Sequence, residues 1–492
     1  MNAGLILIPI LLPVAAGACL PLFHFKERKA RERYVTAAVL ATSLALLFLI
    51  LNRPEGVITL LPLTEDLSIA FRMDGLSCVF LGLVGFLWPL ASCYAFEYIK
   101  HEGMDDKFFS FYTMTYGVTV GIAASANLIT MYLCYELLTL VTLPLVMHAM
   151  NNRAVAAGRK YLAYSIGGAA LAFAGIMILY VYGDKSLTFV YGGFVNPAVN
   201  GGERDILLAG YLLTFFGFGV KAAVFPFHGW LPSAGVAPTP VTALLHAVAV
   251  VKAGVFAIMR STFYCFGTGL LAGTWAQEAA MIFAMATILF GSAMAWRDLH
   301  IKRRLAYSTV SNLSYIVFGV TLMTPAGFTG ALCHMIFHGL MKITLFFCAG
   351  AVMYKTHREY VTELDGFGAG MPVTFAAFTI ASLALTGVPL LPGFISKWSL
   401  ATAAASTGEP LAFAGVLVLL ASAVLTAAYL FTVVVRAYFP GVSFDRAKIA
   451  DVRDPNWYMC VPLGILCGTM VFLGLCSPLL TNLLAQVAGG LV

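Results

Sequence analysis

The amino-acid sequence predicts an all-α polytopic membrane protein with about 14 transmembrane helices. Hydrophobic residues make up 60% of the 492 residues and charged residues 11%, whereas soluble domains contain about 25% charged residues. Apolar runs of about 20 residues, long enough to cross a hydrocarbon layer of about 30 Å, recur from Ala3 to Val492. We therefore expect a single transmembrane domain over residues 1–492.

The expected membrane spans follow one another with short loops between them. Several are longer than a bilayer is thick, which indicates tilted or interrupted helices. The first segment lacks a basic n-region, so we interpret it as a membrane helix and not as a cleaved signal peptide. In chain order the spans cover residues 3–23, 35–51, 75–96, 108–125, 127–148, 161–182, 205–227, 238–265, 270–296, 301–325, 327–354, 372–402, 409–438 and 457–486.

Lysine and arginine residues test this topology, because positive charge collects in short cytoplasmic loops. One set of alternate loops holds Lys26, Arg28, Lys29, Arg31, Arg33, Lys100, Lys107, Arg153, Arg159, Lys160, Arg297, Lys302, Arg303, Arg304, Lys355, Arg358, Arg436, Arg446, Lys448 and Arg453. The other set holds Arg53, Arg72, Lys185, Arg204 and Arg260. This bias predicts a multi-pass protein of the cell membrane with both termini on the non-cytoplasmic side. The net charge of +6 is mostly loop charge and implies no nucleic-acid partner.

Four basic residues and one carboxylate remain well inside the spans: Lys221, Lys252, Lys342, Lys397 and Glu136. The carboxylates Asp74, Glu97, Glu278 and Asp298 sit near helix ends. A charge at mid-bilayer costs at least about 2.5–3.5 kcal/mol. A salt bridge between Glu136 and Lys221 would explain two charges, but four lysines cannot all pair with one carboxylate. We therefore favour a role in ion transfer over purely structural pairing.

Lysine suits proton transfer in a membrane. Removing its side chain from water disfavours the charged form, so that the group gains and loses a proton near neutral pH, whereas a nearby carboxylate restores the charge. A change in the distance between Glu136 and Lys221 would therefore load or release a proton.

Two of the lysines lie five residues from a proline, Lys221 before Pro226 and Lys397 after Pro392. Proline removes a backbone donor and clashes with the preceding turn, so we expect interrupted helices at both places, in spans seven and twelve. Paired broken helices are typical of inverted repeats with ion sites at the breaks. We expect a first repeat over residues 108–265, with spans four to eight, and a second over 270–438, with spans nine to thirteen.

Three histidines accompany the central lysines. His334, His338 and Lys342 are spaced i, i+4, i+8 and share one helix face, which favours a proton relay with water. His246 and Lys252 point about 240° apart on an ideal helix, so they need a distortion or a water molecule to communicate. His246 could instead be an ordinary core histidine. A zinc site at His334 and His338 is disfavoured, because no cysteine or carboxylate ligand accompanies them.

The sequence offers no sign of a bound cofactor or metal. The ten cysteines occur singly without CxxC, and GxGxxG and GxxxxGK[ST] are absent. If electrons are involved, another subunit carries them. Polar residues within the spans are expected mostly to cross-link helices; they are Tyr132, Tyr135, Thr139, Ser165, Ser308, Ser311, Asn312 and Ser314.

Six motifs along the chain carry a family resemblance: Phe71-Arg72-Met73-Asp74-Gly75-Leu76, Tyr135-Glu136-Leu137, Pro226-Phe227-His228-Gly229-Trp230-Leu231-Pro232, Ala237-Pro238-Thr239-Pro240-Val241 with Leu245-His246-Ala247, Arg303-Arg304-Leu305-Ala306-Tyr307-Ser308, and Gly393-Phe394-Ile395-Ser396-Lys397. Together they resemble the antiporter-like subunits of complex I, the related subunits of membrane-bound hydrogenases and the D subunit of Mrp-type sodium/proton antiporters.

The resemblance implies a fourteen-helix inverted-repeat fold within a multisubunit membrane assembly. It implies that Glu136 and Lys221 form the input pair and that Lys397 is the outer site. Lys252, His246, His338 and Lys342 would form the axis between them. Lys397 departs from the glutamate of one complex I subunit type, and the chain ends after the fourteenth span without a lateral helix. Both departures favour the D-type or hydrogenase-linked branch.

Three functional hypotheses follow. The leading one is a proton-translocating membrane subunit of a complex I-like oxidoreductase or membrane-bound hydrogenase, with protons as the transported ion and Na⁺ as a further candidate. The second is the D-type subunit of an Mrp-like Na⁺/H⁺ antiporter, driven by ion gradients alone. The third is a membrane scaffold that transports nothing.

Overall fold

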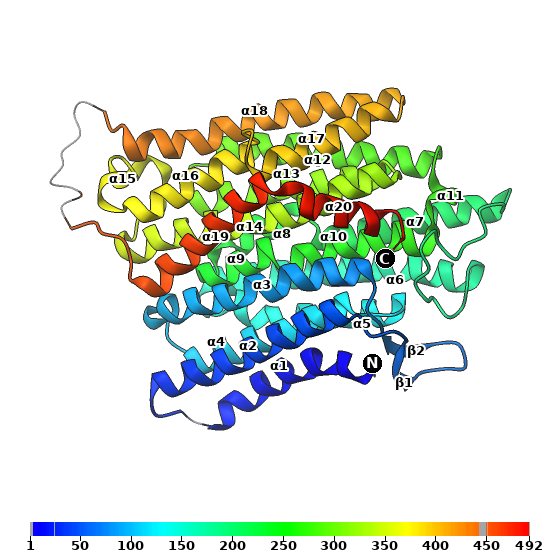
Figure 1. Ribbon diagram of the computed structural model, residues 1–492, viewed down its shortest axis with the longest axis horizontal. Coiled ribbons are helices and arrows are strands. Elements are labelled where there is room, and N and C mark those ends of the chain that lie inside the picture. The colour runs from blue at the N-terminus through cyan, green and yellow to red at the C-terminus, as the bar shows by residue number, and fades with distance from the viewer. Residues whose placement is uncertain (1–2, 24, 442–448, 450, 492) are drawn as a thin grey trace.

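The computed structural model describes residues 3–23, 25–441, 449 and 451–491, and its long helices lie side by side in one bundle (Figure 1). Arg446 and Lys448, which entered the topology count, lie outside the described residues. The first helical segment and the end of the last helix lie on the same side of the bundle, near the small hairpin (Figure 1).

The N-terminal part of the chain forms six long helices and a hairpin. Its elements are η1 (Ala3–Leu7), α1 (Ile8–Cys19), η2 (Leu20–Phe23), α2 (Arg28–Asn52), β1 (Ile58–Pro62), β2 (Ser68–Phe71), α3 (Gly75–Tyr98), η3 (Ile99–His101), α4 (Asp105–Ala123), α5 (Leu128–Val146) and α6 (Asn152–Tyr182).

The middle of the chain contains the shortest helices and the first interruptions. Its elements are α7 (Gly202–Lys221), η4 (Phe227–Gly229), α8 (Trp230–Ser233), η5 (Ala234–Val236), α9 (Thr239–Ala247), α10 (Val250–Arg260), the π-helix η6 (Ser261–Phe266), α11 (Thr268–Leu271) and α12 (Trp275–Arg297).

The C-terminal part returns to long helices that are broken once near the middle and once near the end. Its elements are α13 (Ile301–Thr321), α14 (Pro325–Thr356), η7 (Val361–Glu363), α15 (Phe367–Gly370), α16 (Pro372–Thr386), α17 (Pro392–Ser406), α18 (Pro410–Tyr438), α19 (Trp457–Leu475) and α20 (Ser477–Ala488).

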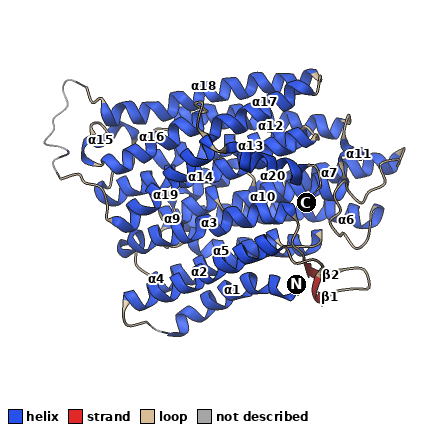
Figure 2. Ribbon diagram, in the orientation of Figure 1, coloured by secondary structure: helices blue, strands red, loops and turns tan. Residues whose placement is uncertain are grey.

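The fold is helical as expected, with one small addition. β1 and β2 pair antiparallel between α2 and α3, on one side of the bundle (Figure 2). Side chains also mark where helices start. Asp74, Asn127, Asn151, Thr274 and Thr324 each accept a hydrogen bond from a backbone N–H of the first turn, the group that an isolated helix start leaves without a partner.

Burial increases from the outer helices to the centre. In the most apolar 18-residue window of each helix, 28% of α18 and 33% of α2 is buried, against 94% of α14 and 100% of the α9–η6 segment. The outer helices expose large apolar side chains such as Leu44, Leu417 and Val424, as expected for a surface in contact with lipid. α14 therefore lies in the core of the bundle, where its histidines and lysine meet other helices.

Within the described residues, ten helices are long and apolar enough to cross a membrane. α4, α7 and α13 have 19, 20 and 21 residues but fall outside that group, and residues 372–406 divide into the shorter α16 and α17. The polytopic membrane fold is confirmed, and the count of 14 spans stays a prediction.

Spans seven and twelve are interrupted, as expected. α7 ends at Lys221 before a short irregular stretch, and residues 387–391 separate α16 from α17. Spans eight and fourteen, for which no particular break was predicted, are also divided. The break in span fourteen comes just before Pro478, which cannot continue the α19 hydrogen-bond ladder.

The break in span eight has no proline inside it. Between α9 and α10, the N–H groups of Val248 and Ala249 both donate to the carbonyl oxygen of Leu244, at 3.0 and 2.9 Å. One carbonyl thus serves two donors, and the regular i to i−4 pattern is lost for one residue. The irregularity lies between His246 and Lys252, whose spacing called for a distortion or a water molecule if the two are to communicate.

Candidate functional site

The eight candidate residues lie on six helices of the bundle. Glu136 is on α5, Lys221 on α7, His246 on α9 and Lys252 on α10, while His334, His338 and Lys342 are on α14 and Lys397 is on α17. The side chains of Lys221, Lys252 and Lys342 are at most 1% exposed, as are the three histidines. Lys397 is half-buried.

Glu136 and Lys221 lie together as expected. The Nζ atom of Lys221 is 3.7 Å from Oε1 of Glu136 and donates a hydrogen bond to the carbonyl oxygen of Tyr135. The same ammonium group stands 3.3 Å from the centroid of the Tyr135 ring. Glu136 keeps 29% of its side chain exposed, whereas Lys221 keeps 1%. The Glu136 side chain is therefore partly exposed while its Oε1, beside Lys221, is buried, and the lysine lies in the core.

The interruption after α7 fixes the position of Lys221. Lys221 is the last helical residue, and Ala223 then adopts a positive φ of 58°. The carbonyl oxygen of Val220 accepts from the indole N–H of Trp230 at 2.7 Å and from the Ala223 N–H at 3.1 Å, so the helix end is held by a side chain as well as by the backbone. A Cβ on Gly254 of α10 would come within 2.5 Å of the Ala222 nitrogen. α10 therefore packs directly against the break that holds Lys221.

Lys252 and His338 form the direct contact at the centre of the bundle. The Nζ atom of Lys252 lies 2.8 Å from Nδ1 of His338, and both side chains are fully buried. Among the described residues, no carboxylate comes within 4.0 Å of the ammonium group of Lys252, Lys342 or Lys397. These lysines are held by neutral acceptors, so their charge is not cancelled by a fixed ion pair.

Lys342 lies one turn beyond His338 and binds a different helix. Its Nζ atom donates to Oγ of Ser308 at 2.6 Å and to the carbonyl oxygen of Leu305 at 3.1 Å. Ser308 is also hydrogen-bonded to the hydroxyl of Tyr429 on α18. Ser308, expected to cross-link helices, thus also contacts a candidate lysine directly.

Lys397 and His334 both lie against the ring of Tyr315. The Nζ atom of Lys397 donates to the carbonyl oxygen of Thr386 at 3.1 Å and lies 5.3 Å from the centroid of the Tyr315 ring. The His334 ring stacks on the same tyrosine with centroids 5.2 Å apart, and its Nδ1 is 2.9 Å from Oγ of Ser396. The start of α17 therefore places Ser396 at His334 and Lys397 near Tyr315.

His246 is not joined to the other candidates by a hydrogen bond. Both of its ring nitrogens are buried without a hydrogen-bond partner among the described residues, and its ring lies 4.7 Å from that of Phe346. Nδ1 of His338 is engaged by Lys252, and no group of three or more His, Cys, Asp or Glu side chains within the described chain could hold a metal ion.

Sequence reasoning missed the burial of several basic residues that it had counted among the loops. Arg260, counted among loop residues, is 0% exposed at the end of α10 and binds Asp74 through two hydrogen bonds of 2.6 and 2.7 Å. The ring of Tyr264 lies 4.5 Å from its guanidinium carbon. Its position inside the expected span 238–265 was the signal that could have found it. Lys302 and Arg304, also counted as loop residues, are 4% and 3% exposed in the first turn of α13.

Comparison with known proteins identifies the family. Residues 125–426 match the family model described as NADH:quinone oxidoreductase/Mrp antiporter, TM. The chain belongs to this family. The matched residues include all eight candidate side chains of this NADH:quinone oxidoreductase/Mrp antiporter family member, from Glu136 to Lys397.

Relatives of this family member come from both branches. The chain is 31% identical over 433 residues to NADH-quinone oxidoreductase subunit N of Desulforudis audaxviator (strain MP104C), covering 86% of this chain and 85% of the relative. It is 33% identical over 336 residues to the A/B subunit of a probable K(+)/H(+) antiporter from Rhizobium meliloti (strain 1021), covering 67% of this chain and 32% of that one.

A solved structure has the same fold. A chain of the membrane-bound sulfane sulfur reductase, an archaeal respiratory membrane complex, superposes with a TM-score of 0.86 at 22% identity. The match covers 99% of this chain and 97% of the other. The likeness extends over the whole bundle, including the regions around the broken helices.

Proposed function

We propose that the chain is a proton-translocating membrane subunit of a complex I-like oxidoreductase or membrane-bound hydrogenase. The observation that carries this proposal is the burial of Lys221, Lys252 and Lys342 in interrupted or central helices. Among the described residues, only Lys221 of these three has a carboxylate within 4.0 Å of its ammonium group, and that carboxylate is Glu136. An ionisable group buried at membrane depth is costly, and such groups in membrane proteins typically mark ion pathways.

The proposed path begins at Glu136 and Lys221, where a change in their 3.7 Å separation changes how strongly the proton is held. It continues through Lys252 and His338, whose 2.8 Å contact is short enough for direct proton transfer. Lys342 and His334 extend it along α14, and Lys397 ends it. Steps that lack a direct hydrogen bond are proposed to proceed through water. His246 is proposed as a polar side group of this axis.

The architecture expected from the sequence fits this role and is part of the proposal. Residues 108–265 and 270–438 would form two inverted repeats, each with a lysine at a broken helix. The termini would lie on the non-cytoplasmic side of the cell membrane. Other membrane subunits of the assembly would supply the energy for transport. Na⁺ would be an additional transported ion if it binds to the Glu136 carboxylate.

The test is proton translocation by the reconstituted assembly with Lys221→Ala or Glu136→Ala. We expect each variant to lose most of its proton translocation while the subunit still assembles. Glu203→Ala is the matched control, because Glu203 is an exposed carboxylate in the first turn of the same helix as Lys221. Undiminished translocation in both site variants would exclude the proposal.

The similarity to a K(+)/H(+) antiporter subunit supports a second candidate, the D-type subunit of an Mrp-like Na⁺/H⁺ antiporter. The same buried residues would then exchange cations against protons without a redox partner. The subunits that co-purify with the chain distinguish the two: iron–sulfur proteins favour the redox-driven assembly, and small membrane subunits alone favour the antiporter.

A scaffold without transport is the third candidate. It requires that Lys252 and Lys342 be replaceable without loss of translocation by the assembly. Methionine at either position tests it, with Lys355→Met as the control, because Lys355 is an exposed lysine in the last turn of α14.

A further inference from the structure

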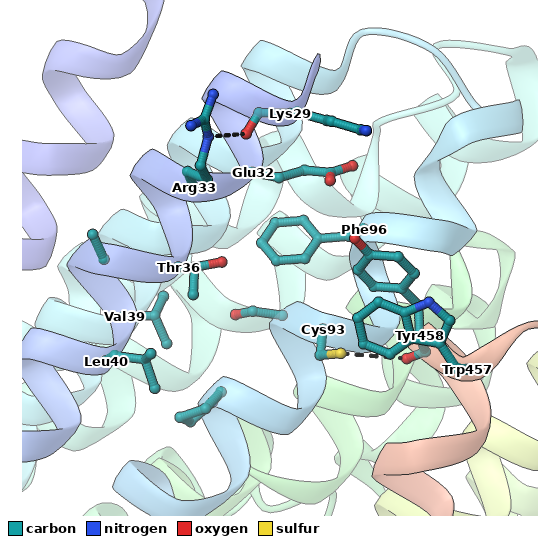
Figure 3. Close-up of a pocket in the computed structure, with 13 residues that line it drawn as sticks. Lys29, Glu32, Arg33, Thr36, Val39, Leu40, Cys93, Phe96, Trp457 and Tyr458 are labelled. Carbon is teal, nitrogen blue, oxygen red and sulfur yellow. Dashed lines mark hydrogen bonds between the residues drawn. The ribbon is translucent and has the colours of Figure 1, made fainter. Parts of the chain in front are cut away.

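A groove on the outside of the bundle lies between α2, α3 and the start of α19 (Figure 3), and none of the eight candidate residues lines it. Its volume is about 750 Å³. It is lined by Lys29, Glu32, Arg33, Thr36, Leu40, Pro89, Cys93, Phe96, Trp457 and Tyr458, among others.

The groove changes from charged to apolar along its length. α2 contributes Lys29 and Arg33 at one end and Leu40 at the other, and the helix rises about 16 Å from Lys29 to Leu40 at 1.5 Å per residue. α3 runs the opposite way: the Phe96 carbonyl oxygen accepts from Arg28 at the charged end, and Pro89, about two turns earlier on α3, belongs to the apolar end. This length is about half the thickness of a bilayer hydrocarbon core, the depth of one leaflet.

The charged end holds two cations that no carboxylate neutralises. Glu32 accepts a hydrogen bond of 2.7 Å from Arg28, outside the groove, so its charge is already matched. Lys29 and Arg33 are exposed, stand one turn apart on the same face, and have no ion pair among the described residues; the Nε of Arg33 donates to the backbone oxygen of Lys29. This end therefore attracts an anion from the surrounding medium.

Aromatic side chains stand between the cations and the apolar end. Trp457 is 60% exposed and stacks on Tyr458 with ring centroids 3.9 Å apart, at the first turn of α19. Tryptophan and tyrosine favour the membrane–water interface, where one side of the ring meets headgroups and the other meets hydrocarbon. They mark the depth at which the groove passes from the headgroup region into the acyl chains.

We propose that this groove binds one anionic glycerophospholipid. Its phosphate lies between Lys29 and Arg33, its ester region lies against Trp457 and Tyr458, and one acyl chain follows α2 past Leu40 to Pro89. The order of cation, aromatic ring and apolar wall matches the order of phosphate, ester and chain in a phospholipid. A helix of a neighbouring subunit would need an acidic residue at one end to match the two cations, whereas an anionic lipid supplies that charge wherever it lies in the leaflet.

The experiment measures lipid binding by the purified, delipidated membrane assembly. Native mass spectrometry is used to compare phosphatidylglycerol with phosphatidylcholine of the same chain length. For the wild-type protein we expect phosphatidylglycerol to bind about tenfold or more tightly than phosphatidylcholine. Lys29→Gln with Arg33→Gln should abolish that preference, because each cation near an anionic headgroup contributes a several-fold increase in affinity.

Two further variants make the result specific. Ala37→Trp fills the apolar wall of the groove and should weaken the binding of both lipids. Arg153→Gln with Arg159→Gln is the control, since both arginines are exposed at the start of α6 on the same side of the bundle and do not line the groove. Equal binding of the two lipids by the wild type would overturn the proposal. So would loss of a neighbouring subunit from the Lys29→Gln, Arg33→Gln assembly without a change in bound lipid. Neither result depends on proton translocation.

Discussion

Nζ of Lys252 lies 2.8 Å from Nδ1 of His338, which joins the first turn of a short interrupted helix to the central helix of the bundle. Both residues are fully buried. The contact is a nitrogen-to-nitrogen hydrogen bond between two candidate proton carriers. Nδ1 accepts the hydrogen bond when Lys252 is charged, which leaves the ring proton on Nε2. Transfer along this bond is therefore the step of the proposed path that mutagenesis tests most directly.

Replacement of His338 by glutamine should separate hydrogen bonding from proton transfer. The glutamine oxygen accepts a hydrogen bond from Lys252 but does not take up a proton near neutral pH. We expect proton translocation by the reconstituted assembly to fall by about 100-fold or more, the usual contribution of a positioned acid–base group. His148→Gln is the control, because His148 is a fully buried histidine after α5 that hydrogen-bonds the Gly103 carbonyl oxygen at 3.0 Å. Equal loss in both variants would contradict a specific role.

Removal of the Ser308 hydroxyl should weaken the hold on Lys342. Ser308→Ala deletes the 2.6 Å hydrogen bond to its Nζ atom, and a hydrogen bond to a charged group contributes about 1.5–3 kcal/mol. We expect slower proton translocation with the assembly intact. Ser399→Ala removes a hydroxyl that bonds its own helix at Ile395 and should leave the rate unchanged. A normal rate in the Ser308 variant would exclude this residue from the path.

A methyl group at Gly387 should disturb the position of Lys397. Gly387 caps α16 with a φ of 99°, and a Cβ there would stand 3.2 Å from Cδ of Lys397. Gly408 has a similar φ of 73° but open space around it. Alanine at either position adds about 1–2 kcal/mol of backbone strain. Only the Gly387 variant should also slow proton translocation, so equal rates in the two variants would contradict the expectation.

Loss of the Asp74 charge should destabilise the chain strongly. Asp74→Asn leaves Arg260 buried without a counter-charge, which costs about 3–5 kcal/mol. We expect a much lower midpoint of thermal unfolding for the assembled protein in detergent. Glu363→Gln is the comparison, because its 3.6 Å pair with Arg358 is partly exposed and contributes at most about 1 kcal/mol. Similar midpoints in the two variants would show that the buried pair is not needed for stability.

The breaks show how far local sequence signals reach. Pro226 and Pro392 predicted the interruptions beside Lys221 and Lys397. Proline lacks the backbone N–H of a helical hydrogen bond, and this holds in any tertiary surroundings. The break at Val248 and Ala249 contains no proline, and its mark is that both N–H groups share the Leu244 carbonyl oxygen. The spacing of His246 and Lys252 called for a distortion or a water molecule between them, but no residue of this stretch marked where the helix breaks.

The buried charges also divide into those that the sequence revealed and others that only the structure revealed. Counting charges against apolar runs was enough to single out Glu136 and the four lysines, because the cost of burying a charge depends on its place in a span. Arg260 escaped the count because its residue number lies near the end of a span, while the structure buries it against Asp74, 186 residues away in sequence.

The sequence by itself determined that this chain is a membrane bundle with proline-marked breaks and ionisable residues at depth, because apolar length, proline and charge act locally along each helix. Beyond the Glu136–Lys221 pair, only the tertiary structure decided which of those residues meet. Close packing sets the rotation and depth of each helix. As a result Lys252 is hydrogen-bonded to His338, Lys342 to Ser308 and His334 to Ser396. Such partners come from different helices, and helical spacing within one segment carries no information about them.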